Sequence, residues 1–258
     1  MCIRDRAQCT ASSYAMRELG VPFAGLFGAC STMAEGLALG AALCEGGAAR
    51  NLLAMASSHF CAAERQFRTP LSYGAVRTPT AQWTATAAGC CLLQPQGEGV
   101  GIAAATFGRV QDYQVKDINN MGAAMAPAAA STLLHYFKDT GTEPQEFDCI
   151  YTGDLGQVGS QLLRELLAAE GLLIKNHVDC GCILFDANEQ SVKSGGSGPG
   201  CCAAVLCGHI LPRLRRGSQK RVLFTATGAL MSQTTFLQKE TIPAVAHLVE
   251  LRAPEKEK

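Results

Sequence analysis

The segment Gly28–Glu35, with the sequence Gly-Ala-Cys-Ser-Thr-Met-Ala-Glu, constrains the fold more than any other part of the chain. It follows a short apolar run at 21–27, for which we predict a strand, and it opens a helix of small residues that runs to about Leu43. A cysteine in the first turn of a helix lies beside unpaired backbone N–H groups and the positive end of the helix dipole, which stabilise a thiolate. Cys30 is therefore a candidate nucleophile, and the alternative is a buried cysteine with a purely structural role.

The composition excludes several classes of protein. With 258 residues, of which 48% are hydrophobic and 17% charged, the chain can bury one large core or two modest ones. Its 22 basic residues balance its 22 acidic residues, so we expect no electrostatic attraction for nucleic acid. No apolar run reaches the roughly 18 residues that a membrane-spanning helix needs. Any association with a membrane is therefore predicted to be peripheral.

The 13 cysteines suggest neither disulfides nor a zinc site. Several lie in apolar, small-residue runs as Cys90-Cys91, Cys180-Gly-Cys182 and Cys201-Cys202, and adjacent cysteines on one element point in different directions. We expect small core residues in a reducing compartment. The one metal-like run, from His177 to Cys182, is not expected to bind a metal, and we predict no cofactor.

Strand-like and helix-like segments alternate along the chain, which predicts an α/β fold with a mixed sheet. The strands are expected at 52–56, 82–93, 101–110, 147–151, 221–226 and 241–251, with a short apolar segment at 183–185, and the helices at 119–139, 157–169 and 201–213. Gly97-Glu98-Gly99 favours a hairpin between 82–93 and 101–110. Residues 60–79 are predicted to form a polar excursion. The glycine-rich segment 194–200 has no Walker lysine and is predicted to be a tight turn that lines a pocket or interface.

Six stretches carry a resemblance to a known family. They are GLFGACSTM at 25–33, SSHFCAAERQFR at 57–68, TAQWT at 80–84, TGDLG at 152–156, SGGSG at 194–198 and ATGALMS at 226–232. Together they resemble the thiolase-like superfamily of thiolases and 3-oxoacyl-acyl-carrier-protein synthases, and more closely the stage V sporulation protein AD family of endospore-forming bacteria. The likeness covers about residues 8–251.

The resemblance implies a layered αβαβα fold made of two similar halves. The C-terminal part of the first half, with the cysteine turn, corresponds to residues 7–115 and the second half to 116–252. The chain reaches Cys30 early, so the opening strands and helices of the first half are expected to be missing. Residues 1–6 do not look like family sequence, and 253–258 are expected to be a disordered tail.

The resemblance also bears on catalysis. Condensing enzymes and thiolases pair their cysteine with a histidine and with a second histidine or an asparagine. The first histidine position falls here on Asp154, and the asparagine position falls within Gly195, Gly196 and Ser197. An aspartate beside Cys30 would raise the pKa of the thiol, because like charges oppose ionisation. The expectation is a vestigial nucleophile on a scaffold without enzymatic activity.

The function implied by the resemblance is binding of dipicolinic acid, with calcium, in the machinery that loads the forespore. Dipicolinate is a flat dianion, which suits a planar slot lined by guanidinium groups and N–H donors. The predicted ligand-binding residues are Cys30, His59, Arg65, Arg68, Arg77, Asp154, Gly195, Gly196 and Ser197. For each arginine the alternative is a solvated loop or an interface salt bridge, and for His59 it is a structural role.

The remaining implications concern partners and location. The resemblance implies a homodimer that contacts other membrane subunits of the stage V sporulation A system and lies peripherally on the forespore or spore inner membrane. Two alternatives to ligand binding stay open. One is an active acyltransferase that uses Cys30, and the other is a structural protein that recruits membrane subunits.

Overall fold

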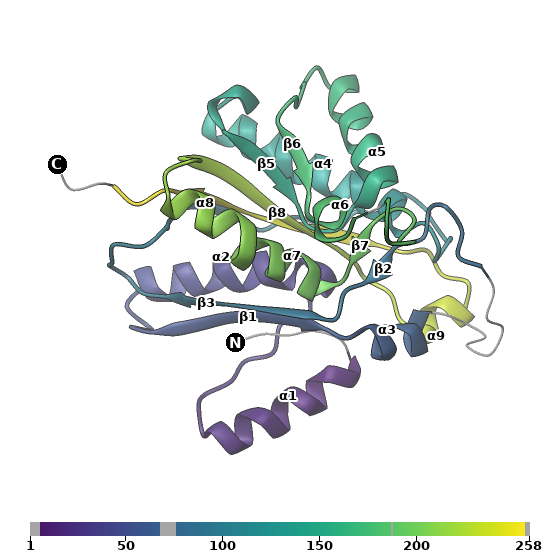
Figure 1. The fold of residues 1–258 in the computed structure, drawn as a ribbon, viewed down its shortest axis with the longest axis horizontal. Helices are drawn as coiled ribbons and strands as arrows, with labels where there is room; N and C mark the ends of the chain where they lie inside the picture. The colour runs from purple at the N-terminus through teal and green to yellow at the C-terminus, as the bar shows by residue number, and fades with distance from the viewer. Residues whose placement is uncertain (1–5, 68–75, 187, 256–258) are drawn as a thin grey trace.

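The computed structural model describes residues 6–67, 76–186 and 188–255, with only the backbone described at 6–11 and 64–67 (Figure 1). Its centre is a five-stranded mixed sheet with the order β4 (Gly101–Thr106), β9 (Ala244–Arg252), β8 (Arg221–Ala229), β5 (Cys149–Thr152) and β6 (His177–Asp179). β8 and β4 run antiparallel to β9, whereas β5 runs parallel to both β8 and β6. β8 and β9 are buried on both faces, which accounts for their nearly continuous apolar sequences.

Two smaller sheets lie beside the central one. β1 (Leu52–Ser58) pairs antiparallel with β3 (Ala87–Leu93), and the two-residue strands β2 (Trp83–Thr84) and β7 (Gly196–Ser197) pair in parallel. The predicted hairpin between 82–93 and 101–110 is wrong, because β3 pairs with β1 whereas β4 pairs with β9 in the central sheet. The turn at 97–99 therefore carries the chain from one sheet to another.

The helices form layers on and between the sheets. In Figure 1, α2 (Thr32–Glu45) and α7 (Pro199–Val205) lie between the β1–β3 sheet and the central sheet, and α4 (Met121–Thr140) and α5 (Gly156–Ala169) cover the other face of the central sheet. α7 continues through the π-helical turn η4 (Leu206–Ile210) into α8 (Leu211–Arg215). The remaining helical elements are α1 (Arg6–Leu19), η1 (Ala29–Ser31), α3 (Phe60–Phe67), η3 (Pro144–Glu146), α6 (Cys180–Leu184) and α9 (Gln233–Leu237).

Two apolar cores hold these layers together. One lies between the sheets and includes Met33, Leu206 and Phe224, and the other lies under α4 and α5 and includes Leu133, Leu163 and Leu223. Phe224 and Leu223 are consecutive residues of β8, so their side chains point to opposite faces of the central sheet. The predicted α/β fold with mixed sheets is confirmed.

Several local predictions are corrected. The strand expected at 21–27 is absent: the segment is irregular, and Leu26 is its one buried residue. The excursion at 60–79 contains a helix, α3, and 68–75 lie outside the described residues. The short apolar segment at 183–185 falls mostly in α6. Pro127 lies inside α4, which begins at Met121 after the Asn120 side chain caps the Ala123 N–H.

A buried carboxylate joins β9 to α4 and β8. The Tyr136 hydroxyl donates to Glu250 at 2.5 Å, and the Nε atoms of Arg221 and Arg252 each donate at 2.7 Å. Burial by itself would raise the pKa of Glu250, but the hydrogen bonds from Arg221, Tyr136 and Arg252 outweigh it and lower the pKa to about 2. Glu250 is therefore ionised in the folded protein throughout the neutral and mildly acidic range.

We expect Glu250→Gln to remove part of the acid sensitivity of folding. A carboxyl whose pKa is lower in the folded state stabilises that state above its unfolded pKa, here near 4.5, and loses this contribution as the pH falls toward 2. After allowance for the exposed Arg252 partner, the contribution is about 2 kcal/mol. Urea unfolding at pH 7 and at pH 2.5 would measure it. Equal pH-dependent losses of unfolding free energy in the parent and in Glu250→Gln would contradict the assignment.

Candidate functional site

The cysteine predicted as a nucleophile lies at the start of α2, in the single turn η1. The backbone N–H and hydroxyl of Ser31 both donate to the Gly28 carbonyl, at 3.0 and 2.5 Å, and the Thr32 hydroxyl donates to the Ala29 carbonyl at 2.7 Å. Ala29 has a φ of +52°, a left-handed conformation that costs a non-glycine residue about 1–2 kcal/mol. The turn that presents Cys30 is thus closed by its own side chains and carries backbone strain.

The central strand β8 packs directly against this turn. A Cβ atom on Gly228 would lie 2.2 Å from the Gly28 carbonyl oxygen and 3.1 Å from the Ser31 nitrogen, so only a glycine fits. Burial raises the pKa of the Glu35 carboxyl, one turn further along α2, and the nearby Gly28 N–H opposes this shift. The Glu35 Oε2 atom is buried without a hydrogen-bond partner. The cysteine turn is therefore held between a glycine of β8 and an acidic side chain of α2.

Asp154, which follows β5, is the polar centre of the site. Its side chain is fully buried and accepts hydrogen bonds from the Ser197 hydroxyl at 3.0 Å, the Gly198 N–H at 2.9 Å and the Thr227 hydroxyl at 2.9 Å. The Cys30 thiol is a fourth hydrogen-bond partner. Burial raises the pKa of the Asp154 carboxyl, and these hydrogen bonds oppose that shift. The structure thus brings Cys30, Asp154 and Ser197 together, from three distant parts of the sequence.

The glycine-rich segment closes the other side of this carboxyl. Gly196 and Ser197 form β7 beside Trp83 and Thr84, and Gly195 adopts a φ of +124° that a side chain would strain. Gln82 clamps the segment, since its Nε2 atom donates to the Asp154 carbonyl at 2.5 Å and to the Gly196 carbonyl at 3.1 Å. Within this segment, the Ser197 hydroxyl and the Gly198 N–H donate to the Asp154 carboxyl.

Neither Gln82 nor Thr227 is among the site residues predicted from the sequence. Both contact Asp154 directly. A signal was present, because Gln82 lies in the TAQWT stretch and Thr227 in the ATGALMS stretch that carry the family resemblance. Neither residue type suggests catalysis by itself, so only the tertiary contact distinguishes them from neighbouring polar residues.

Arg77, one of the predicted cations, lies beside β2. Arg77 lies 4.4 Å from the Trp83 ring centroid and 5.6 Å from that of Phe60, and the two rings stack at 4.5 Å. Its Nη1 atom also donates to the Gln82 carbonyl at 3.3 Å. His59 is exposed where β1 ends, directly before Phe60. The Arg65 side chain and Arg68 lie outside the described residues, so their predicted roles stay predictions.

In the metal-like run from His177 to Cys182, Asp179 holds the turn that follows β5 through hydrogen bonds. Asp179 accepts hydrogen bonds from the N–H groups of Leu155 and Gly156, each at 2.9 Å, and from the Thr152 hydroxyl at 2.6 Å. Burial raises the pKa of Asp179 to about 7. Its oxygens thus fix the turn that carries Asp154. Within the part of the chain that the structure describes, no three His, Cys, Asp or Glu side chains are grouped to hold a metal.

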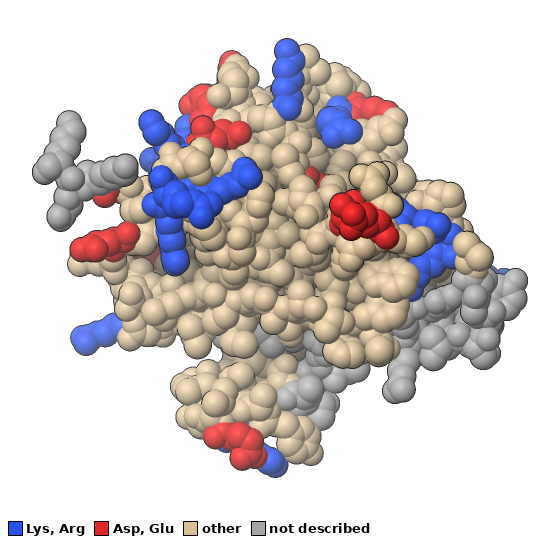
Figure 2. Space-filling model, viewed as in Figure 1, with Lys and Arg blue, Asp and Glu red and all other residues tan. Residues whose placement is uncertain are grey.

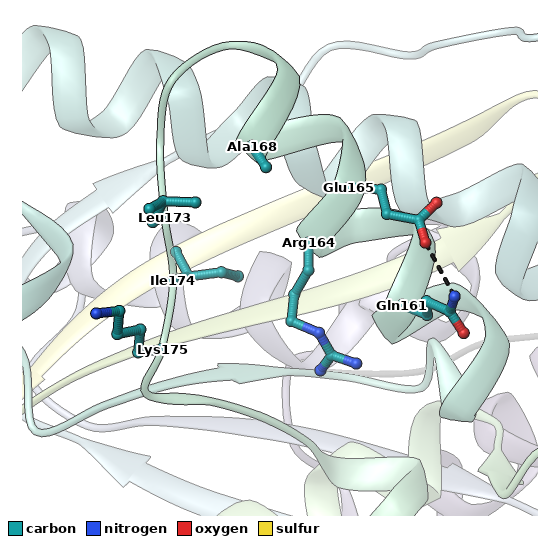
Figure 3. A pocket seen from close by; sticks show the side chains of 7 residues that line it. All are labelled: Gln161, Arg164, Glu165, Ala168, Leu173, Ile174 and Lys175. Carbon is teal, nitrogen blue, oxygen red and sulfur yellow. Dashed lines mark hydrogen bonds between the residues drawn. The ribbon is translucent and has the colours of Figure 1, made fainter.

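A surface hollow of about 320 Å³ lies on α5 and the segment before β6 (Figure 3). It contains none of the residues that the sequence singled out. Arg164 and Lys175 supply positive charge to it, and the Gln161 amide donates to the Glu165 carboxylate at 2.9 Å. The other lining residues are Ala168, Leu173 and Ile174. The hollow is therefore separate from the cysteine site.

The layered sheets, with a cysteine at a helix start facing the ends of β5 and β8, define a thiolase-like fold. The structure aligns with 3-oxoacyl-[acyl-carrier-protein] synthase III from Aquifex aeolicus VF5 at a TM-score of 0.57 and 14% identity, covering 97% of this chain and 76% of that one. It aligns with an OleA variant from Xanthomonas campestris at a TM-score of 0.60 and 14% identity, covering 97% and 73%. These alignments confirm the fold.

The chain belongs to the Stage V sporulation protein AD family. The sequence model of that family matches residues 6–252. Stage V sporulation protein AD of Bacillus subtilis (strain 168) is 43% identical over 241 residues, which are 93% of this chain and 71% of that protein. The resemblance drawn from the six stretches is confirmed, and family membership gives the chain a role in sporulation.

Proposed function

We propose that this chain is a non-catalytic, dipicolinate-binding component of the sporulation machinery. The observation that carries the proposal is the hydrogen bond between the Cys30 thiol and the buried Asp154 carboxyl. A carboxylate opposes ionisation of a neighbouring thiol, whereas the histidine expected at this position in condensing enzymes would promote it. A thiol that donates to an acid is a hydrogen-bonding group of the site and not an activated nucleophile.

The cation for a dianionic ligand is assigned in this proposal to Arg77. Arg77 is half-buried and its guanidinium carbon lies 4.4 Å from the Trp83 ring centroid, so the side chain has less freedom to lose when a carboxylate binds. A planar guanidinium pairs with a carboxylate through two parallel hydrogen bonds. His59 directly precedes Phe60, whose ring stacks on Trp83, and the side chain of His59 is exposed. In this proposal it supplies a further hydrogen-bond donor to the ligand. The proposal assigns Cys30, Asp154, Gly195, Gly196 and Ser197 to the same site, because Gln82 is hydrogen-bonded both to Arg77 and to the carbonyls of Asp154 and Gly196.

We expect Arg77→Ala to weaken dipicolinate binding at least tenfold, because one carboxylate loses its charged partner. Arg77→Lys keeps the charge but loses the planar fork, so its loss should be smaller, about three- to tenfold. Isothermal titration calorimetry of the parent and both variants, with and without calcium, would measure these changes.

Arg164→Ala is the matched control, since Arg164 lies in the separate hollow. Arg68→Ala belongs in the same series, because Arg68 is also among the ligand-binding residues predicted from the sequence. Unchanged binding in Arg77→Ala together with a loss in Arg68→Ala would move the cation to Arg68. Unchanged binding in both variants would overturn the arginine assignment. Absence of heat in the parent at millimolar dipicolinate would favour the structural recruiter.

An acyltransferase remains the second candidate, favoured by the strained turn that presents Cys30. Incubation of the protein with an acyl-thioester, followed by mass spectrometry of the peptide that contains Cys30, tests it. Acylation with turnover would refute the non-catalytic proposal. Lack of acylation under conditions in which iodoacetamide labels Cys30 would support it.

The proposed location is the surface of the forespore or spore inner membrane, in contact with membrane subunits of the stage V sporulation A system. Lys and Arg side chains gather over α8 (Figure 2), where Arg213, Arg215, Arg216 and Lys220 are exposed. Such a cluster attracts anionic headgroups. None of the described helices has the length and apolar character to cross a bilayer. We also propose a homodimer, which sedimentation equilibrium of the purified chain would test.

A further inference from the structure

Two cysteines outside the Asp154 site lie against each other. The Cys91 sulfur, on β3, is 3.9 Å from the Cys207 sulfur in η4, although 116 residues separate them in the chain. Both side chains are half-buried. Gly89 makes this approach possible, because a Cβ there would lie 2.5 Å from the Ala203 carbonyl oxygen. The missing side chain lets the end of α7 and the start of η4 pack closely on β3.

The surroundings of this cysteine pair favour a reactive thiolate at Cys207. A hydrogen bond from Cys91 lowers the pKa of Cys207 to about 7, and the positive charge of Arg215 acts in the same direction. Burial has the opposite effect elsewhere: it raises the pKa values of Cys180, Cys201 and Cys202 well above the usual range. Cys207 is thus distinguished from the buried core thiols by geometry and by charge.

We propose that Cys91 and Cys207 form a redox site that a hydroperoxide converts to a disulfide. The Cys207 thiolate attacks the peroxide oxygen, which gives a sulfenic acid and releases hydroxide that takes up a proton to form water. The Cys91 thiol then attacks the Cys207 sulfur, forms the S–S bond and expels a second water molecule. With hydrogen peroxide, the two sulfurs together lose two electrons and the two peroxide oxygens gain them. A rotation of both side chains must shorten the sulfur–sulfur distance to that of a disulfide bond.

The disulfide would restrain α7 and η4, the helical segment that begins at the candidate site. α7 starts directly after Gly198, whose N–H donates to Asp154, and the Cys202 thiol of α7 donates to the Cys30 carbonyl at 3.6 Å. η4, which continues α7 and leads into α8, contains Cys207. Oxidation therefore ties the middle of this continuous helix to β3. The inference does not depend on which ligand the site binds.

The test uses the reduced chain, treated with hydrogen peroxide, alkylated, digested and analysed by mass spectrometry. The expected product is a peptide pair that joins Cys91 to Cys207 and is lighter by two hydrogen atoms than the reduced peptides. Cys91→Ser and Cys207→Ser should each abolish it, and Cys91→Ser should leave a sulfenic acid on Cys207 that dimedone traps. Cys61→Ser, which removes an exposed thiol on α3, is the matched control and should retain the link.

A further variant separates the two neighbouring cysteines of β3. Cys90→Ser should keep the link, because Cys91 and not Cys90 faces Cys207 across a thiol–thiol contact. Hydrogen exchange of residues 199–210 should slow by at least threefold on oxidation of the parent and stay unchanged in Cys91→Ser. Complete alkylation of Cys91 and Cys207 after peroxide treatment would overturn the proposal. A link that survives in Cys91→Ser but not in Cys90→Ser would overturn it as well.

Discussion

Gly228→Ala is expected to lower the free energy of unfolding by about 3 kcal/mol, at the upper end of the usual cost of overpacking. The added methyl group would lie 2.2 Å from the Gly28 carbonyl oxygen, which is backbone and cannot rotate away. The cysteine turn must therefore move off β8. Because the Asp154 contacts depend on that turn and on Thr227, any ligand binding at the site should fall with the stability. Urea unfolding monitored by circular dichroism measures the first effect and calorimetry the second.

Gly208→Ala is the matched control for this change. Gly208 lies in η4, and a Cβ there has no atom within 4 Å. Replacement of a helical glycine by alanine should leave stability unchanged or raise it by up to about 1 kcal/mol. Equal unfolding free energies for Gly228→Ala and the parent would show that β8 and the cysteine turn are not in contact as described.

Asp154→Ala is expected to cost about 3–5 kcal/mol of unfolding free energy, the larger of the two effects. The carboxyl satisfies the hydroxyls of Ser197 and Thr227 and the N–H of Gly198, and its loss leaves these buried donors without an acceptor. Asp154→Asn can keep an oxygen at the position that accepts from Ser197 and Gly198, and the Thr227 hydroxyl can rotate to accept from its amide. Its cost should therefore be smaller, about 1–2 kcal/mol. Thermal and urea unfolding of the two variants would establish the order.

The asparagine variant also tests the contact with Cys30. Removal of the carboxyl takes away a group that opposes thiolate formation, so iodoacetamide should label Cys30 at least threefold faster at pH 7. The labelling rate against pH, followed by mass spectrometry, gives the comparison. The same profile in the parent and in Asp154→Asn would refute the contact, and a greater loss of stability in Asp154→Asn than in Asp154→Ala would refute the hydrogen-bond account.

Local patterns in the sequence were sufficient where neighbouring residues control the outcome. The Gly-Ala-Cys turn and the start of the following helix, the helix at 157–169 and the strands at 221–226 and 241–251 all appear close to their predicted positions as η1 with α2, α5, β8 and β9. Turn geometry, small-residue helices and runs of apolar residues depend on contacts within a few positions. The six family stretches added the layered fold and the family itself.

Pairing between distant strands was decided only in the tertiary structure. The segments 82–93 and 101–110 have the composition of a hairpin, yet they lie in different sheets, β3 beside β1 and β4 beside β9. The run at 21–27 has the apolar content of a strand but pairs with no other strand among the residues that the structure describes. A strand needs a partner for its backbone hydrogen bonds, and no local pattern identifies that partner.

The candidate site divides in the same way. The sequence by itself identified Cys30 at a helix start and the glycine-rich turn, since each has a local signature, and the family resemblance identified Asp154. Only the tertiary structure placed the Ser197 and Thr227 hydroxyls on the Asp154 carboxyl and Arg77 on the Trp83 ring. Burial, hydrogen bonding and stacking depend on residues that are far apart in the sequence and adjacent in the fold. The chemistry of this site therefore depends on the packing of β5, β7 and β8 around the Asp154 carboxyl.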